Sequence, residues 1–87
     1  MISETVTVTT TRVKLISDST SWRKIYLHVI GNEPIYLGGN NVTTANGLTT
    51  EKHTSPIEID VPAQEELWAI SASSVDVRVL RPSLYVD

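Results

Sequence analysis

The 87-residue chain has no cysteine and no phenylalanine, and lysine and arginine together number only seven. The absence of cysteine excludes a disulfide framework, a thiolate metal site and a thiol nucleophile. The basic residues are scattered singly in a chain of formal charge −3, whereas nucleic-acid binding normally needs a basic face. We therefore expect no nucleic-acid partner, and we expect assembly to add to the stability of a small core.

Long apolar runs are also missing from the sequence. No stretch approaches the roughly 20 apolar residues that a membrane-spanning helix needs. The first ten residues, MISETVTVTT, lack the basic segment and apolar run of a secretory signal. We therefore predict no membrane partner and a soluble product of the cytoplasm.

Valine, isoleucine and threonine, by contrast, make up 29 residues, a third of the chain, against four alanines. Their β-branched side chains favour strands over helices. Short segments that alternate apolar and polar residues recur at spacings of about ten residues, without longer helical periodicity. This pattern predicts an all-β fold: a single antiparallel β-sandwich domain over residues 1–87, jelly-roll or Greek-key-like, with about seven to eight short strands.

The two ends of the chain are expected to lie at the edge or on the surface of this sandwich. Residues 4–11 (ETVTVTTT) alternate valine with threonine, which predicts an edge strand or arm within a threonine-rich N-terminal segment, residues 1–11. Residues 75–80 (VDVRVL) form a core strand, and Pro82 interrupts any ladder beyond it. Residues 81–87 are therefore expected to be a C-terminal tail on the surface.

Two hairpins are predicted from local turn signals. Residues 22–30 (WRKIYLHVI) turn at Gly31 into a strand that begins at Pro34, so these two strands should pair antiparallel. Residues 65–72 (EELWAISA) should pair with residues 75–80 after a turn of two serines. Residues 65–72 also fit a short helix, but their apolar side chains occupy both alternating faces, which favours a strand.

The stretch PIYLGGNNVTTANG, residues 34–47, runs from a short strand into a loop of glycine, asparagine and threonine. Glycine permits backbone angles that other residues disfavour, so we assign sharp turns to three glycines: Gly38, Gly39 and Gly47. A brief extended segment between these turns is expected to face a partner: Val42, Thr43 and Thr44. Residues 48–54 should continue as loop with at most a few extended residues.

Catalytic chemistry finds little support in the sequence. His28 lies at a polar position of its strand, and the only candidate co-ligands for a metal at His53 are Glu58 and Asp60. The adjacent glutamates at positions 65 and 66 would point to opposite faces of a strand and cannot form an acid-base pair. We therefore predict a protein that is not an enzyme and that holds no metal or cofactor.

A contact surface is predicted on the outer side of the strands. Ile25, Leu27 and Val29 share the core face of residues 22–30, so the large side chains of opposite parity should face outward. The predicted contact residues are Trp22, Tyr26, Trp68 and Ile70. Apolar groups on an outer face mark interfaces, although the chain's own arm or tail is an alternative cover. We expect a closed cyclic homo-oligomer, with a dimer possible on symmetry grounds alone.

The order of these motifs resembles a class of small virion proteins of tailed bacteriophages. In that class a "(V/I)YLGG…VTT.NG" loop precedes an "…ELYAI.AS…DVRVL" segment, and here the corresponding residues read IYLGGNNVTTANG and ELWAISASSVDVRVL. The similarity runs from about Trp22 to Leu80. The glycine pair, the spacing of VTT and NG, and the ELWAISAS segment carry it, because they recur together.

The resemblance implies a non-enzymatic capsid decoration protein that binds the major capsid protein and stabilises the outer shell. It implies a homotrimer on the surface of the virion, made in the host cytoplasm. The alternative is a minor tail protein or a host-attachment, carbohydrate-binding sandwich. In that case Trp22, Tyr36 and Trp68 would stack on sugar, and Asn40 and Asn41 would donate hydrogen bonds.

Overall fold

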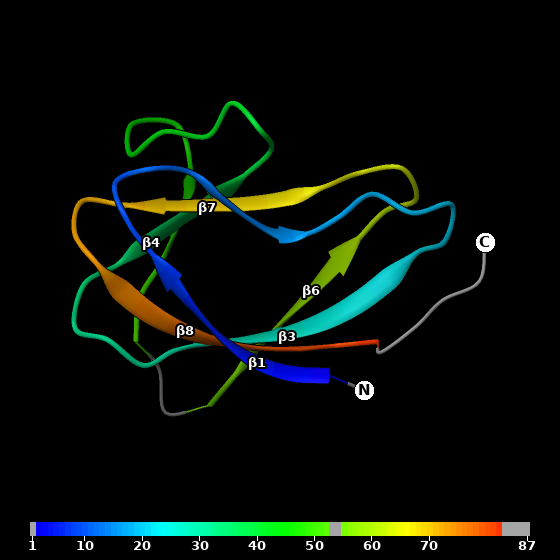
Figure 1. The fold of residues 1–87 in the computed structure, drawn as a ribbon, viewed down its shortest axis with the longest axis horizontal. Helices are drawn as coiled ribbons and strands as arrows, with labels where there is room; N and C mark the ends of the chain where they lie inside the picture. The colour runs from blue at the N-terminus through cyan, green and yellow to red at the C-terminus, as the bar shows by residue number, and fades with distance from the viewer. Residues whose placement is uncertain (1, 53–54, 83–87) are drawn as a thin grey trace.

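The computed structural model describes residues 2–52 and 55–82, and all regular structure within these ranges is β-strand (Figure 1). This confirms the predicted all-β fold. Residues 67–71, within the segment 65–72 that also fitted a short helix, form a strand. The described part of the chain contains no helix that is long and apolar enough to cross a membrane. The eight strands are β1 (Ile2–Val8), β2 (Val13–Ile16), β3 (Arg23–Val29), β4 (Ile35–Gly38), β5 (Leu48–Thr50), β6 (Ile57–Val61), β7 (Leu67–Ser71) and β8 (Val75–Arg81).

The strands pair as one long antiparallel ribbon that is rolled on itself. Along this ribbon β1 pairs with β8, β2 with β7, β3 with β6 and β4 with β5. Rolling joins β8 to β3 and β7 to β4, which gives sheet A in the order β1-β8-β3-β6 and sheet B in the order β2-β7-β4-β5. In Figure 1, β7 and β4 of sheet B lie above β8, β3 and β1 of sheet A. This is a jelly roll, so the predicted sandwich is confirmed.

The core lies between the two sheets and follows from strand alternation. In β3, Ile25, Leu27 and Val29 are buried, as predicted, because every second side chain of a strand points to the same face. The inward residues of β8 alternate in the same way. One continuous apolar cluster joins side chains of both sheets: Val8, Leu15, Ile16, Ile25, Leu27, Val29, Ile35, Leu37, Val61, Ala69, Val75, Val77 and Val79.

Both predicted hairpins are wrong. β3 and β4 lie in different sheets, and so do β7 and β8. The turn signals at Gly31 and at the two serines are real, but each connection carries the chain across the core to the opposite sheet. A local turn signal cannot distinguish a reversal within one sheet from a crossing between two sheets. Among the strands of the described residues, β4 and β5 are the one consecutive pair that shares a ladder.

The ends and the loop after Gly47 agree in part with prediction. The N-terminal segment is an edge strand, since all of β1 pairs with β8, from Ile2 opposite Arg81 to Val8 opposite Val75. The expected loop of residues 48–54 contains the three-residue strand β5. Arg81 continues β8 rather than beginning a tail, and residues 83–87 lie outside the described residues.

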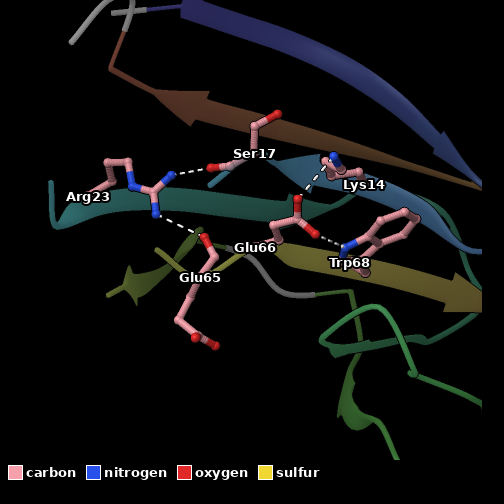
Figure 2. Close-up of polar contacts among 6 residues, drawn as sticks. All are labelled: Lys14, Ser17, Arg23, Glu65, Glu66 and Trp68. Carbon is pink, nitrogen blue, oxygen red and sulfur yellow. Dashed lines mark hydrogen bonds and ion pairs between the residues drawn. The ribbon is translucent and has the colours of Figure 1, made fainter. Parts of the chain in front are cut away.

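A buried arginine ties two connections of the sandwich together (Figure 2). Arg23 begins β3 at an inward position and is only 3% exposed. Its Nη2 donates to the carbonyl oxygens of Pro62 and Glu65, both at 3.0 Å, and its Nη1 donates to the carbonyl oxygen of Ser17. These acceptors offset the cost of burying a charge, so the β2–β3 connection is held against the β6–β7 connection.

Candidate binding site

A hollow of about 540 Å3 lies on the outer face of sheet B. Its floor comes from β7, and its two walls come from the β1–β2 and β4–β5 connections, which lie near β7 in Figure 1. The residues that line it are Thr10, Thr11, Arg12, Asn40, Val42, Thr43, Trp68 and Ile70. The hollow therefore joins three segments that are far apart in the sequence.

The floor follows from the alternation of β7. Ala69 and Ser71 point inward and are buried, so Trp68 and Ile70 point outward and are half-buried. Across the ladder from β4, Gly38 pairs with Trp68. Because Gly38 carries no side chain, the outer face beside the indole has room for a residue from the following loop.

Val42 occupies this space, and two glycines make it possible. Its Cγ2 lies 2.9 Å from where a Cβ on Gly38 would be and 2.8 Å from where a Cβ on Gly47 would be. Both distances are too short for a real carbon contact. A Cβ on Gly47 would also lie 2.6 Å from Cβ of Tyr36. The β4–β5 connection therefore folds down onto sheet B and buries Val42, which is only 1% exposed.

The loop that follows Val42 is held by its own hydrogen bonds. The amide of Thr43 donates to Oδ1 of Asn46 at 2.7 Å, and the amides of Ala45 and Asn46 donate to Oγ1 of Thr43, both at 3.2 Å. The amide of Gly47 donates to the carbonyl oxygen of Thr43 at 3.0 Å. The wall of the hollow is thus a closed turn in which the side chains of Thr43 and Asn46 are held by hydrogen bonds.

The two walls are joined by a hydrogen bond. Nη1 of Arg12 donates to the carbonyl oxygen of Asn40 at 2.7 Å. Arg12 and Asn40 are both exposed, so the guanidinium also presents charge and donors at the rim. This contact links the β1–β2 connection to the β4–β5 connection across the hollow.

An ion pair holds the indole of Trp68 in place (Figure 2). Its Nε1–H donates to Oε1 of Glu66 at 3.0 Å, and Oε2 of Glu66 accepts from Nζ of Lys14 at 3.1 Å. Nζ of Lys14 also lies 5.5 Å from the centroid of the indole ring, within the range of a cation–π contact. The hydrogen bond from Trp68 and then that from Lys14 hold the pKa of Glu66 below its ordinary value.

The lining of the hollow combines apolar and hydrogen-bonding groups. An indole and an isoleucine side chain form an apolar floor, while threonine hydroxyls, an asparagine and a guanidinium surround it. Such a combination gives contact area at the centre and directional hydrogen bonds at the rim. Within residues 2–52 and 55–82, no group of three or more metal-ligating side chains comes together. His53, which was considered as a metal ligand from the sequence, lies outside these ranges.

The predicted contact residues fall on different faces. Trp68, Ile70 and Thr43 line the hollow, and Thr44 is exposed on the same loop. Tyr26, in contrast, lies on the outer face of sheet A, and Trp22 precedes β3 and is 68% exposed. A single surface that includes all of them does not exist in this chain.

Val42 and the three turn glycines need a different explanation from the one predicted. Val42 is buried, so its side chain supports the loop and is not available to a partner. No described glycine has a positive φ. Gly38 and Gly47 are required by close packing, whereas a Cβ on Gly39 would meet nothing nearer than 3.7 Å. The one positive φ among non-glycine described residues, 67°, belongs to Gln64, which the sequence did not reveal.

Several lining residues were not predicted as part of a site. Thr10 and Thr11 appeared only as the end of a threonine-rich arm, Arg12 was not singled out, and Asn40 appeared only under the carbohydrate alternative. Their proximity depends on the way β1 and β2 divide between the two sheets. No pattern within residues 9–12 signals that arrangement.

Comparisons of the chain with protein-family models, with curated proteins and with solved structures found no match. The class that the structure defines is therefore one of fold: an all-β sandwich of eight antiparallel strands with a lined hollow on the outer face of one sheet.

Proposed function

We propose that this chain is a non-enzymatic structural protein of a tailed-bacteriophage virion, which decorates the capsid and stabilises it. The observation that carries the proposal is the composition of the hollow. The loop with VTTANG and the strand with ELWAIS, which both carry the resemblance, meet there as wall and floor. Jelly rolls are frequent among viral shell proteins, which adds support at the level of fold.

The proposed partner is the major capsid protein, bound through the hollow. A preformed wall loses little conformational entropy on docking, and the hydrogen bonds of Thr43 and Asn46 supply that order. Trp68 is already oriented by Glu66, and tryptophan at the centre of an interface contributes strongly to affinity. A homotrimer on the virion surface remains part of the proposal, and light scattering of the free protein tests it.

The test compares two threonine-to-lysine variants that differ in location. Thr10 lies at the rim of the hollow, and Thr5 lies exposed on the outer face of sheet A. Thr10→Lys should reduce the occupancy of purified shells at least tenfold, and Thr5→Lys should reduce it less than twofold. Both should retain the melting temperature of the wild type within about 2 °C. Equal occupancy of the two variants would contradict docking through the hollow.

The second candidate is a host-attachment module that binds carbohydrate, in the tail or on the capsid. The specific observation in its favour is the half-buried indole of Trp68 beside threonine hydroxyls and the guanidinium of Arg12, because sugars stack on aromatic rings and accept directional hydrogen bonds. Lectins also use jelly rolls. Titration of tryptophan fluorescence with host-surface glycans separates the two: saturable quenching that Thr10→Lys abolishes, with shell occupancy unchanged, favours the carbohydrate site.

A further inference from the structure

The two open sides of the sandwich have opposite character. On the side of β1 and β2, Glu4 and Arg81 occupy inward positions and form an ion pair at 3.1 Å. Inward-pointing charges are a known protection of edge strands against pairing with other chains. On the side of β5 and β6, an apolar hollow of about 270 Å3 opens between the sheets. The apolar side chains that line it are Leu37, Leu48, Ile57, Ile59 and Leu67.

These apolar side chains are covered poorly by the chain itself. Leu48 is 72% exposed. Ile57 and Ile59 point toward the inside of the sandwich yet remain half-buried, because β5 opposite them is only three residues long. The side of β5 and β6 therefore lacks the polar protection that Glu4 and Arg81 give the other side.

The backbone of β6 is also open on this side. Among the described residues β6 pairs with β3 alone, at the end of sheet A. An edge strand presents amide and carbonyl groups that can accept a further strand. Pro56 and Pro62 flank β6, so the available edge is limited to the five residues of the strand.

The outer face of β6 carries negative charge. Glu58 and Asp60 point outward and are exposed. The cation that faces them is Lys24 of β3, 3.7 Å from Glu58 and opposite Asp60 in the ladder. Two carboxylates against one ammonium leave this edge acidic, and exposed ion pairs of this kind are weak.

A second copy of this chain fits the edge badly. Antiparallel pairing of β6 with its own copy would set carboxylates opposite carboxylates on the outer face, which is destabilising. Pairing with the β1 edge of a copy would place Glu4 against the apolar hollow, at a desolvation cost. A segment in which apolar residues alternate with lysine or arginine matches both faces. Its apolar side chains would face the hollow, and its basic side chains would lie beside Glu58 and Asp60.

We propose that the β6 edge binds an extended segment of another protein, of alternating apolar and basic residues, as a fifth strand of sheet A. The backbone of the segment pairs with β6, its apolar side chains cover Leu48, Ile57 and Ile59, and its basic side chains face Glu58 and Asp60. This site is separate from the hollow on sheet B and does not depend on the proposed virion function.

The experiment uses a fluorescent peptide of nine residues that alternates valine with lysine, and a matched peptide with glutamate in place of lysine. The full chain should bind the lysine peptide at least tenfold more tightly. Binding should slow amide hydrogen exchange across residues 57–61. The double variant Glu58→Gln/Asp60→Asn should bind the lysine peptide at least fivefold more weakly and lose most of the preference over the glutamate peptide.

The matched control removes two exposed carboxylates elsewhere, in the variant Asp18→Asn/Glu33→Gln, and should change the affinity less than twofold. Leu48→Asn tests the apolar part and should weaken binding of the lysine peptide without a change in peptide preference. Equal effects of the two double variants would overturn the proposal, since they would show only a dependence on net charge. Absence of binding by the lysine peptide would also overturn it. A dimer of the free chain in which residues 57–61 are protected from hydrogen exchange would also overturn it, because the occupant of the edge would then be a second copy.

Discussion

Val42 packs over Gly38, with its Cγ2 2.9 Å from where a Cβ on that glycine would lie. Gly38 pairs with Trp68 in the ladder, so Val42 lies on the outer face of sheet B beside the indole. The contact between Val42 and Gly38 therefore holds the β4–β5 connection against sheet B. The position of one wall of the hollow therefore depends on an absent side chain in the sheet. Gly38 and Gly47 make this close approach possible, and no described glycine has a positive φ.

Replacing Gly47 with alanine should destabilise the fold. The added Cβ would meet Cβ of Tyr36 at 2.6 Å and Cγ2 of Val42 at 2.8 Å, so the loop must shift. Overpacking of this kind costs about 1–3 kcal/mol, to be measured by urea denaturation. Gly39→Ala is the control and should cost less than about 0.5 kcal/mol, since its Cβ meets only ordinary contacts. Equal losses for both variants would show that backbone conformation, and not packing, requires glycine here.

Arg23→Lys should destabilise the chain although the charge is retained. The guanidinium donates to three carbonyl oxygens, those of Ser17, Pro62 and Glu65, and an ammonium cannot reach all three from one position. We expect a loss of about 2–4 kcal/mol in free energy of unfolding. The control is Arg78→Lys, an exposed arginine on the outer face of sheet A, for which the loss should be below about 0.5 kcal/mol. A similar stability of both variants would mean that the Arg23 contacts contribute little.

The environment of Trp68 should change with pH. The pKa of Glu66 is lowered from 4.5 by the hydrogen bond from Trp68 and then by that from Lys14, so the carboxylate is the form that the fold favours. Its contribution to stability is complete above pH 4.5 and is lost as the pH falls through the lowered pKa. Tryptophan fluorescence should therefore show a transition with a midpoint below pH 4.5. Glu66→Gln should remove this transition, and its persistence in that variant would assign it to another group.

Deletion of residues 1–8 should abolish the cooperative unfolding transition. Val8 is fully buried, and β1 covers the free edge of β8 along its whole length. Its loss would expose the inner face of β8 at one side of the core. Near-ultraviolet circular dichroism and urea titration measure the result. A deletion variant that retains a sharp transition would show that β1 is an accessory arm.

The alternation of the sequence was sufficient to predict the fold class and the core, and insufficient to predict which strands pair. Ile25, Leu27 and Val29 follow from period-two patterning because burial on one face of a strand is a local property. The pairing of β3 with β8 and β6 is not local: it depends on how the ribbon rolls. The predicted hairpins failed for this reason.

The candidate site shows the same division. Trp68 and Ile70 could be assigned to an outer face from their parity in β7, and the VTTANG segment could be recognised as a structured loop. Two other features depended on contacts that could not be predicted. Arg12 reaches Asn40, 28 residues away. Val42 is buried over Gly38, four residues away. Only the first of these needs the jelly roll. The burial of Val42 over Gly38 follows from steric packing, because a Cβ at Gly38 would occupy the space of Val42. Turn propensity alone does not predict it.

The pairing of β1 with β8 has a consequence during synthesis of the chain. β1 finds its neighbour in sheet A only when Val75–Arg81 has also been made. Until then, the valines of β1 and the core face of β3 lack their cover from β8. The domain should therefore stay protease-sensitive until β8 has been made, and then become resistant in a single step.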